Sequence, residues 1–254
     1  MKIAPWDRPA FQPTGRTASV RLIAFAEEDV LTGADLELRD AVPVGAPADA
    51  LTLGRHLHAD DPDWFDGWRT DGLRNMAVTA LGDLAQLDAA TCCYSITIEL
   101  NDPADLTFLQ LAWAVASALS RAGSFATLDV YACNWHHGAG VATLPPERPF
   151  SIQDEVSLIA ETEPSGGFGH PVHTRGMIKF GRPDLIAGVP VERIEHTGRI
   201  LNHLARMLAE GNVLVPGQRL RFDGERTLTV TPYEPDGTTP DVALANDGLL
   251  LVDS

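Results

Sequence analysis

The sequence predicts an α+β fold in which helices pack on a mixed, largely antiparallel sheet. Alternating apolar and polar residues at 92–100 predict a strand with one buried face. Apolar residues at helical spacing predict amphipathic helices at 73–87 and 191–210. Because strand–helix–strand units are mixed with hairpins, we expect a ferredoxin-like arrangement of these elements.

The remaining elements follow from local signals. Asp102 can cap a helix that Gly123 ends, and a strand at 127–132 comes next. Crossovers of this kind are nearly always right-handed, so the strands before and after this helix should be parallel in one sheet. Further strands are expected at 20–26, 156–163, 172–180, 220–222, 228–230 and 249–252, with 164–169 as the connection of a hairpin.

Length and composition suggest how the chain is divided. A chain of 254 residues can form one large domain or two small ones. We expect residues 1–18 to form an extended lead-in and residues 19–254 to form a single α+β domain, with subdomains at 19–135 and 155–254 as the alternative. The segment 42–68 is rich in Pro, Gly and Asp, and we expect it to be a long loop of the kind that often carries function.

Charge and cysteine content limit the partners and the compartment. The net charge of −16 repels phosphate backbones, so nucleic acid is excluded as the expected partner, while basic proteins and metal cations are favoured. The same acidity is also a common route to solubility. Three cysteines do not make a disulfide framework, the N-terminus lacks a signal-peptide core, and the apolar helix near 106–119 is expected to be buried in protein. We therefore expect a cytoplasmic protein without a membrane partner, of undetermined oligomeric state.

A short string of histidines and aspartates is the strongest metal-like motif. His56, His58, Asp60 and Asp61 offer imidazole and carboxylate ligands of the kind that bind first-row metals. His136 and His137 could join them from another loop. The alternative is an exposed polar loop that binds no metal, because a motif without its structural context is weak.

Carboxylates and large aromatic residues alternate in the same part of the chain. This acidic/aromatic loop could be a contact surface for a basic partner, since Trp and Phe anchor interfaces and acids attract cations. The alternative is a small hydrophobic cluster that pins the loop to the body of the protein. The residues concerned are Asp60, Asp61, Asp63, Trp64, Phe65 and Trp68.

Positive charge is concentrated in one later segment. His173, Arg175 and Lys179 share one face of the strand expected at 172–180, and Arg182 follows it. These four side chains could form an anion site for a carboxylate or phosphate. In a chain this acidic, ion pairs within the protein are the alternative.

The segment from Thr174 to Leu185 also carries a recognisable pattern. Its residues fit T-x-G-M-x-x-F-G-x-P-E/D-L, which resembles the carboxy-terminal signature of a bacterial domain family of unknown function. In that family an amphipathic helix follows, as at 191–210 here, and then a turn near a Pro-Gly dipeptide, here Pro216-Gly217. The resemblance implies no assigned activity and no catalytic residues. Because its motif positions are mostly glycine, proline and apolar residues, they suit a fold signature better than an active site.

Two hypotheses about function follow from these observations. The first is a non-enzymatic cytoplasmic binding protein, of the immunity or adaptor type, that holds a partner through the acidic/aromatic loop and needs no cofactor. The second is a metal-dependent hydrolase that uses the histidine and aspartate cluster with a divalent metal such as Zn²⁺.

Overall fold

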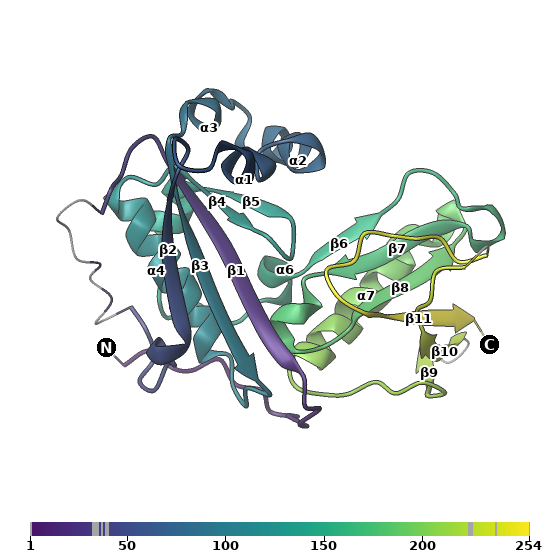
Figure 1. Ribbon diagram of the computed structural model, residues 1–254. Helices are drawn as coiled ribbons and strands as arrows, with labels where there is room; N and C mark the ends of the chain where they lie inside the picture. The colour runs from purple at the N-terminus through teal and green to yellow at the C-terminus, as the bar shows by residue number, and fades with distance from the viewer. Residues whose placement is uncertain are drawn as a thin grey trace. The chain divides into compact units, whose positions relative to one another are not determined.

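The computed structural model describes residues 2–31, 36, 38, 41–222, 226–236 and 238–253 (Figure 1). The chain divides into two compact units, each with its own sheet and helices. The first unit comprises Met1–Asp7 and Ser19–Phe150, and the second comprises Arg8–Ala18 and Ser151–Ser254. Both sheets are mostly antiparallel, which confirms the predicted α+β class. None of the described helices is long and apolar enough to cross a membrane.

The first unit contains a five-stranded sheet in the order β2-β3-β1-β4-β5. Helix α4 lies along one face of the sheet, whereas α1, α2 and α3 gather at one end (Figure 1). Phe65 of α1 and Leu87 of α3 share a buried cluster with Phe25 of β1 and Trp135 of β5. The elements are β1 (Thr17–Ala26), β2 (Leu51–Leu57), β3 (Cys92–Asn101), β4 (Ala126–Asp129), β5 (Asn134–His137), η1 (Ala48–Ala50), α1 (Pro62–Gly67), α2 (Asp71–Leu81), α3 (Ala85–Ala89), α4 (Thr107–Ala122) and α5 (Gly138–Ala142).

The expected strand–helix–strand unit is present as β3, α4 and β4, whose two strands lie in one sheet on either side of β1. The start of its helix was predicted too early. Asp102 has a left-handed backbone with φ of 45° and lies before the helix. Asp105 instead accepts hydrogen bonds from the backbone N–H and the hydroxyl of Thr107, where α4 begins.

Two other predictions for this unit are corrected. The helix expected at 73–87 is broken into α2 and α3, because Gly82 adopts φ of 75° and ends α2. The segment 42–68 is not a long irregular loop, since it contains β2, paired with β3 from Leu51 to Leu57, and the helix α1.

The second unit contains a six-stranded sheet in the order β6-β7-β8-β11-β10-β9. The predicted hairpin of β6 and β7 is confirmed, and α7 packs against both of its strands and against β8. The pairing of β8 with β11 is parallel. The elements are α6 (Ile152–Glu155), β6 (Ser157–Ala160), η2 (Gly166–Phe168), β7 (His170–Arg175), η3 (Met177–Phe180), β8 (Asp184–Val189), η4 (Val191–Arg193), α7 (Ile194–Ala209), β9 (Arg219–Phe222), β10 (Arg226–Pro232) and β11 (Gly248–Asp253).

The strand expected at 172–180 ends at Arg175. Gly176 and Gly181 both have left-handed backbones, with φ of 117° and 61°, and between them the chain forms the 3-10 helix η3. The chain then continues into β8, a strand that was not predicted. The first residues are also more than an extended lead-in, because Arg8 donates hydrogen bonds to the carbonyl oxygens of Ala209 and Phe180 within the second unit.

Asp184 begins β8 as a fully buried carboxyl group. Its Oδ1 accepts hydrogen bonds from the Thr174 hydroxyl at 3.1 Å and from the Met177 N–H at 3.2 Å. Burial is the largest effect and raises the pKa of Asp184 from 3.8 to about 7. Between these two pH values the folded protein therefore keeps a proton that the unfolded chain has lost, so this group contributes less to stability as the pH rises.

We therefore predict that Asp184→Asn flattens the pH dependence of stability. The free energy of unfolding of the wild type should fall between about pH 5 and pH 8 by on the order of 1–3 kcal/mol more than that of the variant, because only the wild type has this carboxyl to ionise. Urea titrations at both pH values measure the difference, with the exposed Asp63→Asn as control. Equal pH dependence in the wild type and Asp184→Asn would contradict the prediction.

Candidate functional site

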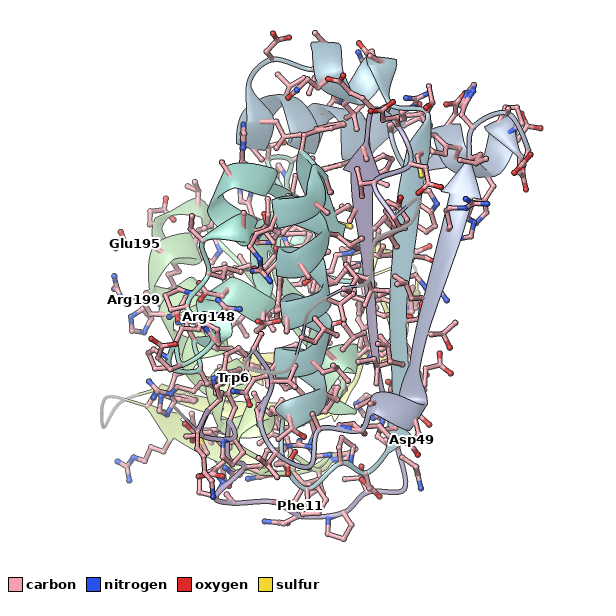
Figure 2. The ribbon with its side chains drawn as sticks, turned by 90° about the vertical axis from the view of Figure 1, so that its left-hand side faces the viewer. Trp6, Phe11, Asp49, Arg148, Glu195 and Arg199 are labelled. Carbon is pink, nitrogen blue, oxygen red and sulfur yellow. The ribbon has the colours of Figure 1, made fainter. Side chains whose placement is uncertain are left out.

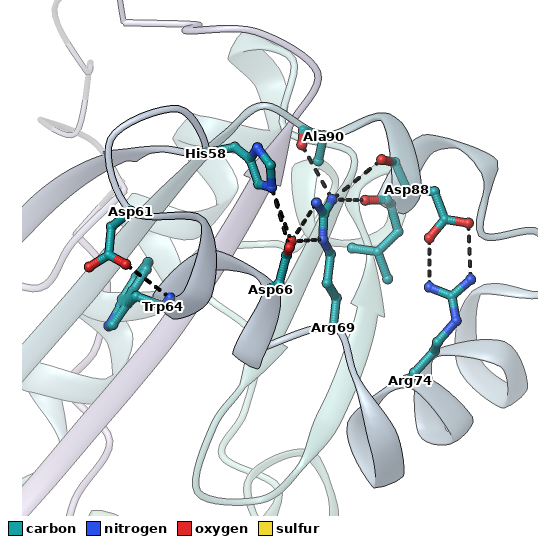
Figure 3. Close-up of polar contacts among 9 residues, drawn as sticks. His58, Asp61, Trp64, Asp66, Arg69, Arg74, Asp88 and Ala90 are labelled. Atoms are coloured by element: carbon teal, nitrogen blue, oxygen red, sulfur yellow. Dashed lines mark hydrogen bonds and ion pairs between the residues drawn. The ribbon is translucent and has the colours of Figure 1, made fainter.

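The acidic/aromatic segment forms the start and body of α1. The Asp61 side chain accepts a hydrogen bond from the Trp64 N–H at 3.1 Å and so caps the helix, with Pro62 at its first position (Figure 3). Phe65 is completely buried and stands edge-on to Phe25, with ring centroids 5.7 Å apart. The sequence placed Phe65 in a contact surface, but a fully buried ring belongs to the core and cannot meet a partner.

The two indoles of this segment are only partly available. Trp64 stacks on His56 with ring centroids 4.0 Å apart and meets Trp68 at 5.6 Å. Both indoles are half-buried and pack against the buried cluster of the first unit. The groups that this segment presents to solvent are mainly the carboxylates of Asp60, Asp61 and Asp63.

Polar contacts fasten α1 to the elements that follow it. Asp66 accepts hydrogen bonds from His58 and, at 2.8 Å, from Arg69 Nε (Figure 3). The bond from Arg69 is the main cause of the lowered pKa of Asp66. Arg69 also donates to the carbonyl oxygens of Leu87 and Ala90, at 2.7 and 3.3 Å. This network holds the segment in place. The charged groups of Asp66 and Arg69 are already engaged in contacts within the protein.

The six candidate metal ligands are not brought together. His56 lies in β2 and His58 follows that strand, whereas His136 and His137 lie in β5, at the opposite edge of the same sheet. Four strand spacings separate these edges, or about 19 Å. Within the described part of the chain, no group of three or more His, Cys, Asp or Glu residues is placed to hold a metal ion. His56 instead contacts the Ser95 hydroxyl at 2.8 Å, and its burial lowers its pKa.

The cationic segment is also arranged differently from the prediction. His173, Lys179 and Arg182 are buried, and the break at η3 prevents Lys179 from sharing the strand face of His173 and Arg175. Lys179 Nζ lies 2.8 Å from a carboxylate oxygen of the buried Glu155. Arg182 donates to the carbonyl oxygens of Gln12 and Gly211, at 2.8 and 2.9 Å. These cations serve internal contacts, so the segment is not an exposed anion site.

An open groove in the second unit is a further candidate site. It has a volume of about 550 Å³ and lies between β6 and the first half of α7. Its apolar floor includes Leu158, whose side chain is 45% exposed, a large fraction for leucine in a sheet. The lining residues are Gln153, Val156, Ser157, Leu158, Ala160, Val172, Ile194, Glu195, Gly198, Arg199 and Asn202.

The alternation of a strand and the small size of one helical residue produce this groove. Val156, Leu158 and Ala160 point to the same side because side chains alternate along an extended chain. Facing them on α7 is Gly198, where an added Cβ would stand 2.8 Å from Leu158 Cδ2. A larger residue at this position would therefore displace Leu158, so Gly198 keeps the groove open.

The groove is surrounded by more acidic than basic side chains. Glu195 and Arg199 form an ion pair at 2.6 Å and project from the outer surface of α7 (Figure 2). Arg193 at the start of the helix lies 3.5 Å from Asp253. The exposed acids on the flanking segments are Asp154, Glu161, Glu163 and Glu192. The local charge therefore has the same sign as the net charge of the chain.

The sequence contained signals for this groove that were not used. The strand and the helix were both predicted, and the glycine at 198 interrupts an otherwise good helical segment, which often marks a close approach. Which strand lies at the sheet edge is a tertiary property, however, and this is what leaves β6 open.

Comparison of the chain with protein-family models, with curated proteins and with solved structures finds no match. The resemblance to a bacterial domain family therefore stays a prediction.

We predict that Lys179→Met destabilises the second unit strongly. Removing the cation leaves the carboxylate of Glu155 buried without its partner, which costs about 3–5 kcal/mol. The double variant Lys179→Met/Glu155→Leu should recover most of this loss, because it removes both buried charges. Urea unfolding measures all three proteins, and a single variant as stable as the wild type would show that the pair is not a structural contact.

We also predict that Phe65→Ala lowers the free energy of unfolding by about 3–5 kcal/mol, because it leaves a cavity in the core. The neighbouring exposed variant Asp63→Ala should change it by less than about 0.5 kcal/mol. Thermal or urea unfolding compares the two. Similar small effects for both would mean that this helix does not pack as described.

Proposed function

We propose that this chain is a binding protein that captures a basic partner protein through the groove between β6 and α7. The observation that carries the proposal is an apolar groove beside an edge strand, with acidic side chains around it. A groove of about 550 Å³ falls in the range that buries a chain segment or a ligand. The surrounding charge favours a cationic partner and disfavours a nucleic acid.

The lining favours recognition over chemistry. It offers apolar side chains, backbone groups and the amides of Gln153 and Asn202, which suit the binding of a polypeptide. Among the described lining residues, the ionisable ones are Glu195 and Arg199, and these two pair with each other. Such a site supports a role of the immunity or adaptor type.

The acidic end of α1 has a lesser part in this proposal. Phe65 is core and the indoles of Trp64 and Trp68 are half-buried, so little aromatic surface is left for an interface. The exposed carboxylates nearby add to the net charge and thereby to the long-range attraction of a basic protein.

Selection from a library of random linear peptides tests the proposal. We expect peptides rich in lysine and arginine to be enriched on the wild type and to lose at least about tenfold in affinity on Leu158→Asp, because this change places a charge on the apolar floor. Fluorescence anisotropy measures the affinities.

The matched control is Val252→Asp, at an equally exposed apolar residue of β11 that does not line the groove. Its affinity for the selected peptides should stay close to that of the wild type. Selection that enriches nothing, or peptides that bind Leu158→Asp as well as the wild type, would refute the proposal.

A further inference from the structure

We infer that the partner segment binds in an extended conformation and adds a strand to the sheet at β6. This inference rests on the proposed function and specifies how the groove is used. In the described sheet β6 is the terminal strand, so one of its two sides pairs with β7 and the other carries no strand. An open edge of this kind is a template for another chain.

The register of the hairpin shows which backbone groups are offered. The Glu161 N–H donates to the Pro171 carbonyl at 2.9 Å, so residues 161 and 171 occupy a hydrogen-bonded position of the ladder, although Pro171 has no N–H to return the second bond. In an antiparallel ladder such pairs alternate with pairs whose N–H and C=O groups point outward. The residues that point outward are therefore Leu158 and Ala160, paired with Thr174 and Val172. Each offers one donor and one acceptor to an added strand.

The same two residues direct their side chains into the groove, beside Gly198. In an antiparallel addition, the partner residue opposite Leu158 exchanges both hydrogen bonds with it and places its own side chain on the same side of the sheet. That side chain enters the apolar groove, so it should be apolar, and its sequence neighbours point away from the groove. Those neighbours should be basic, because Glu161 and Glu163 follow the strand and Asp154 precedes it.

Charge distinguishes this occupant from the alternatives. A second copy of the chain would bring its own acidic rim to the edge, which the repulsion between like charges opposes. A helical segment would cover the apolar floor, but it would leave the outward N–H and C=O groups of Leu158 and Ala160 without partners once water is excluded. An extended basic segment supplies hydrogen-bond partners for these backbone groups and positive charge for the acidic side chains around the groove.

Backbone N-methylation of a probe tests the strand addition. The probe is a synthetic peptide in which lysine and valine alternate, made unmodified, N-methylated on every valine, or N-methylated on every lysine. An added strand uses alternate N–H groups, so one methylated form should lose at least about tenfold in affinity while the other binds like the unmodified peptide. Antiparallel addition predicts that the valine form is the one that fails.

The outcomes separate the inference from the proposed function. Equal affinities of the two methylated forms, with binding still lost on Leu158→Asp, would overturn strand addition and leave the groove as a binding site. An unmodified peptide that fails to bind, or that binds Leu158→Asp equally well, would overturn both. A dimer of the protein that dissociates on Leu158→Asp, measured by sedimentation, would assign the edge to a second copy and overturn the partner assignment.

Gly198→Ala provides a second test that keeps the edge intact. The added Cβ displaces Leu158 toward the groove, so the affinity for the probe should fall by about tenfold although alanine favours the helix. The control is Gly72→Ala in α2, where an added Cβ meets no atom within 4 Å, and it should bind the probe normally. If Gly198→Ala binds the probe as tightly as the wild type, the apolar side chain of the bound peptide does not lie in the groove beside Gly198.

Discussion

The buried guanidinium of Arg182 ties together segments of the second unit that are distant in sequence. It is the largest fully buried side chain among the described residues, and a guanidinium keeps its charge under all ordinary conditions. Its donors reach the carbonyl oxygens of Gln12, Gly211 and Asn212. Arg182 therefore ties the segment after α7 to the start of β8, while Arg8 bonds the last carbonyls of the helix. These bonds fix the C-terminal end of α7.

Local signals in the sequence predicted much of this architecture. The features that depend on contacts between residues distant in sequence were not predicted. The hairpin of β6 and β7 and the helix α7 follow from alternation, helical spacing and a glycine-rich connection, all of which are readable within one segment. The strand β8 was missed because it is buried on both faces and lacks alternation, as is usual for an inner strand with a parallel neighbour.

The candidate sites differ from their predictions for the same reason, because they depend on contacts between distant residues. Spacing placed Lys179 on a strand face with Arg182 after it, and ion pairs within the protein were the alternative. The partners Glu155 and Gln12 are distant in sequence, so the sequence could not identify them. His56 and His137 were grouped by residue type, although the strand order places them at opposite edges of a sheet. The groove depends on which strand ends the second sheet, which is likewise a consequence of tertiary pairing. Residue type therefore indicated possible chemistry, and topology decided which residues can act together.

Amide hydrogen exchange at Leu158 and Ala160 tests the central claim most directly. Their N–H groups point to the open edge, so in the free protein they should exchange rapidly, whereas that of Ile159, which faces β7, should be protected. Addition of the alternating lysine and valine peptide should protect Leu158 and Ala160 to the level of Ile159. Binding of the peptide with no gain in protection at these two amides would contradict the account.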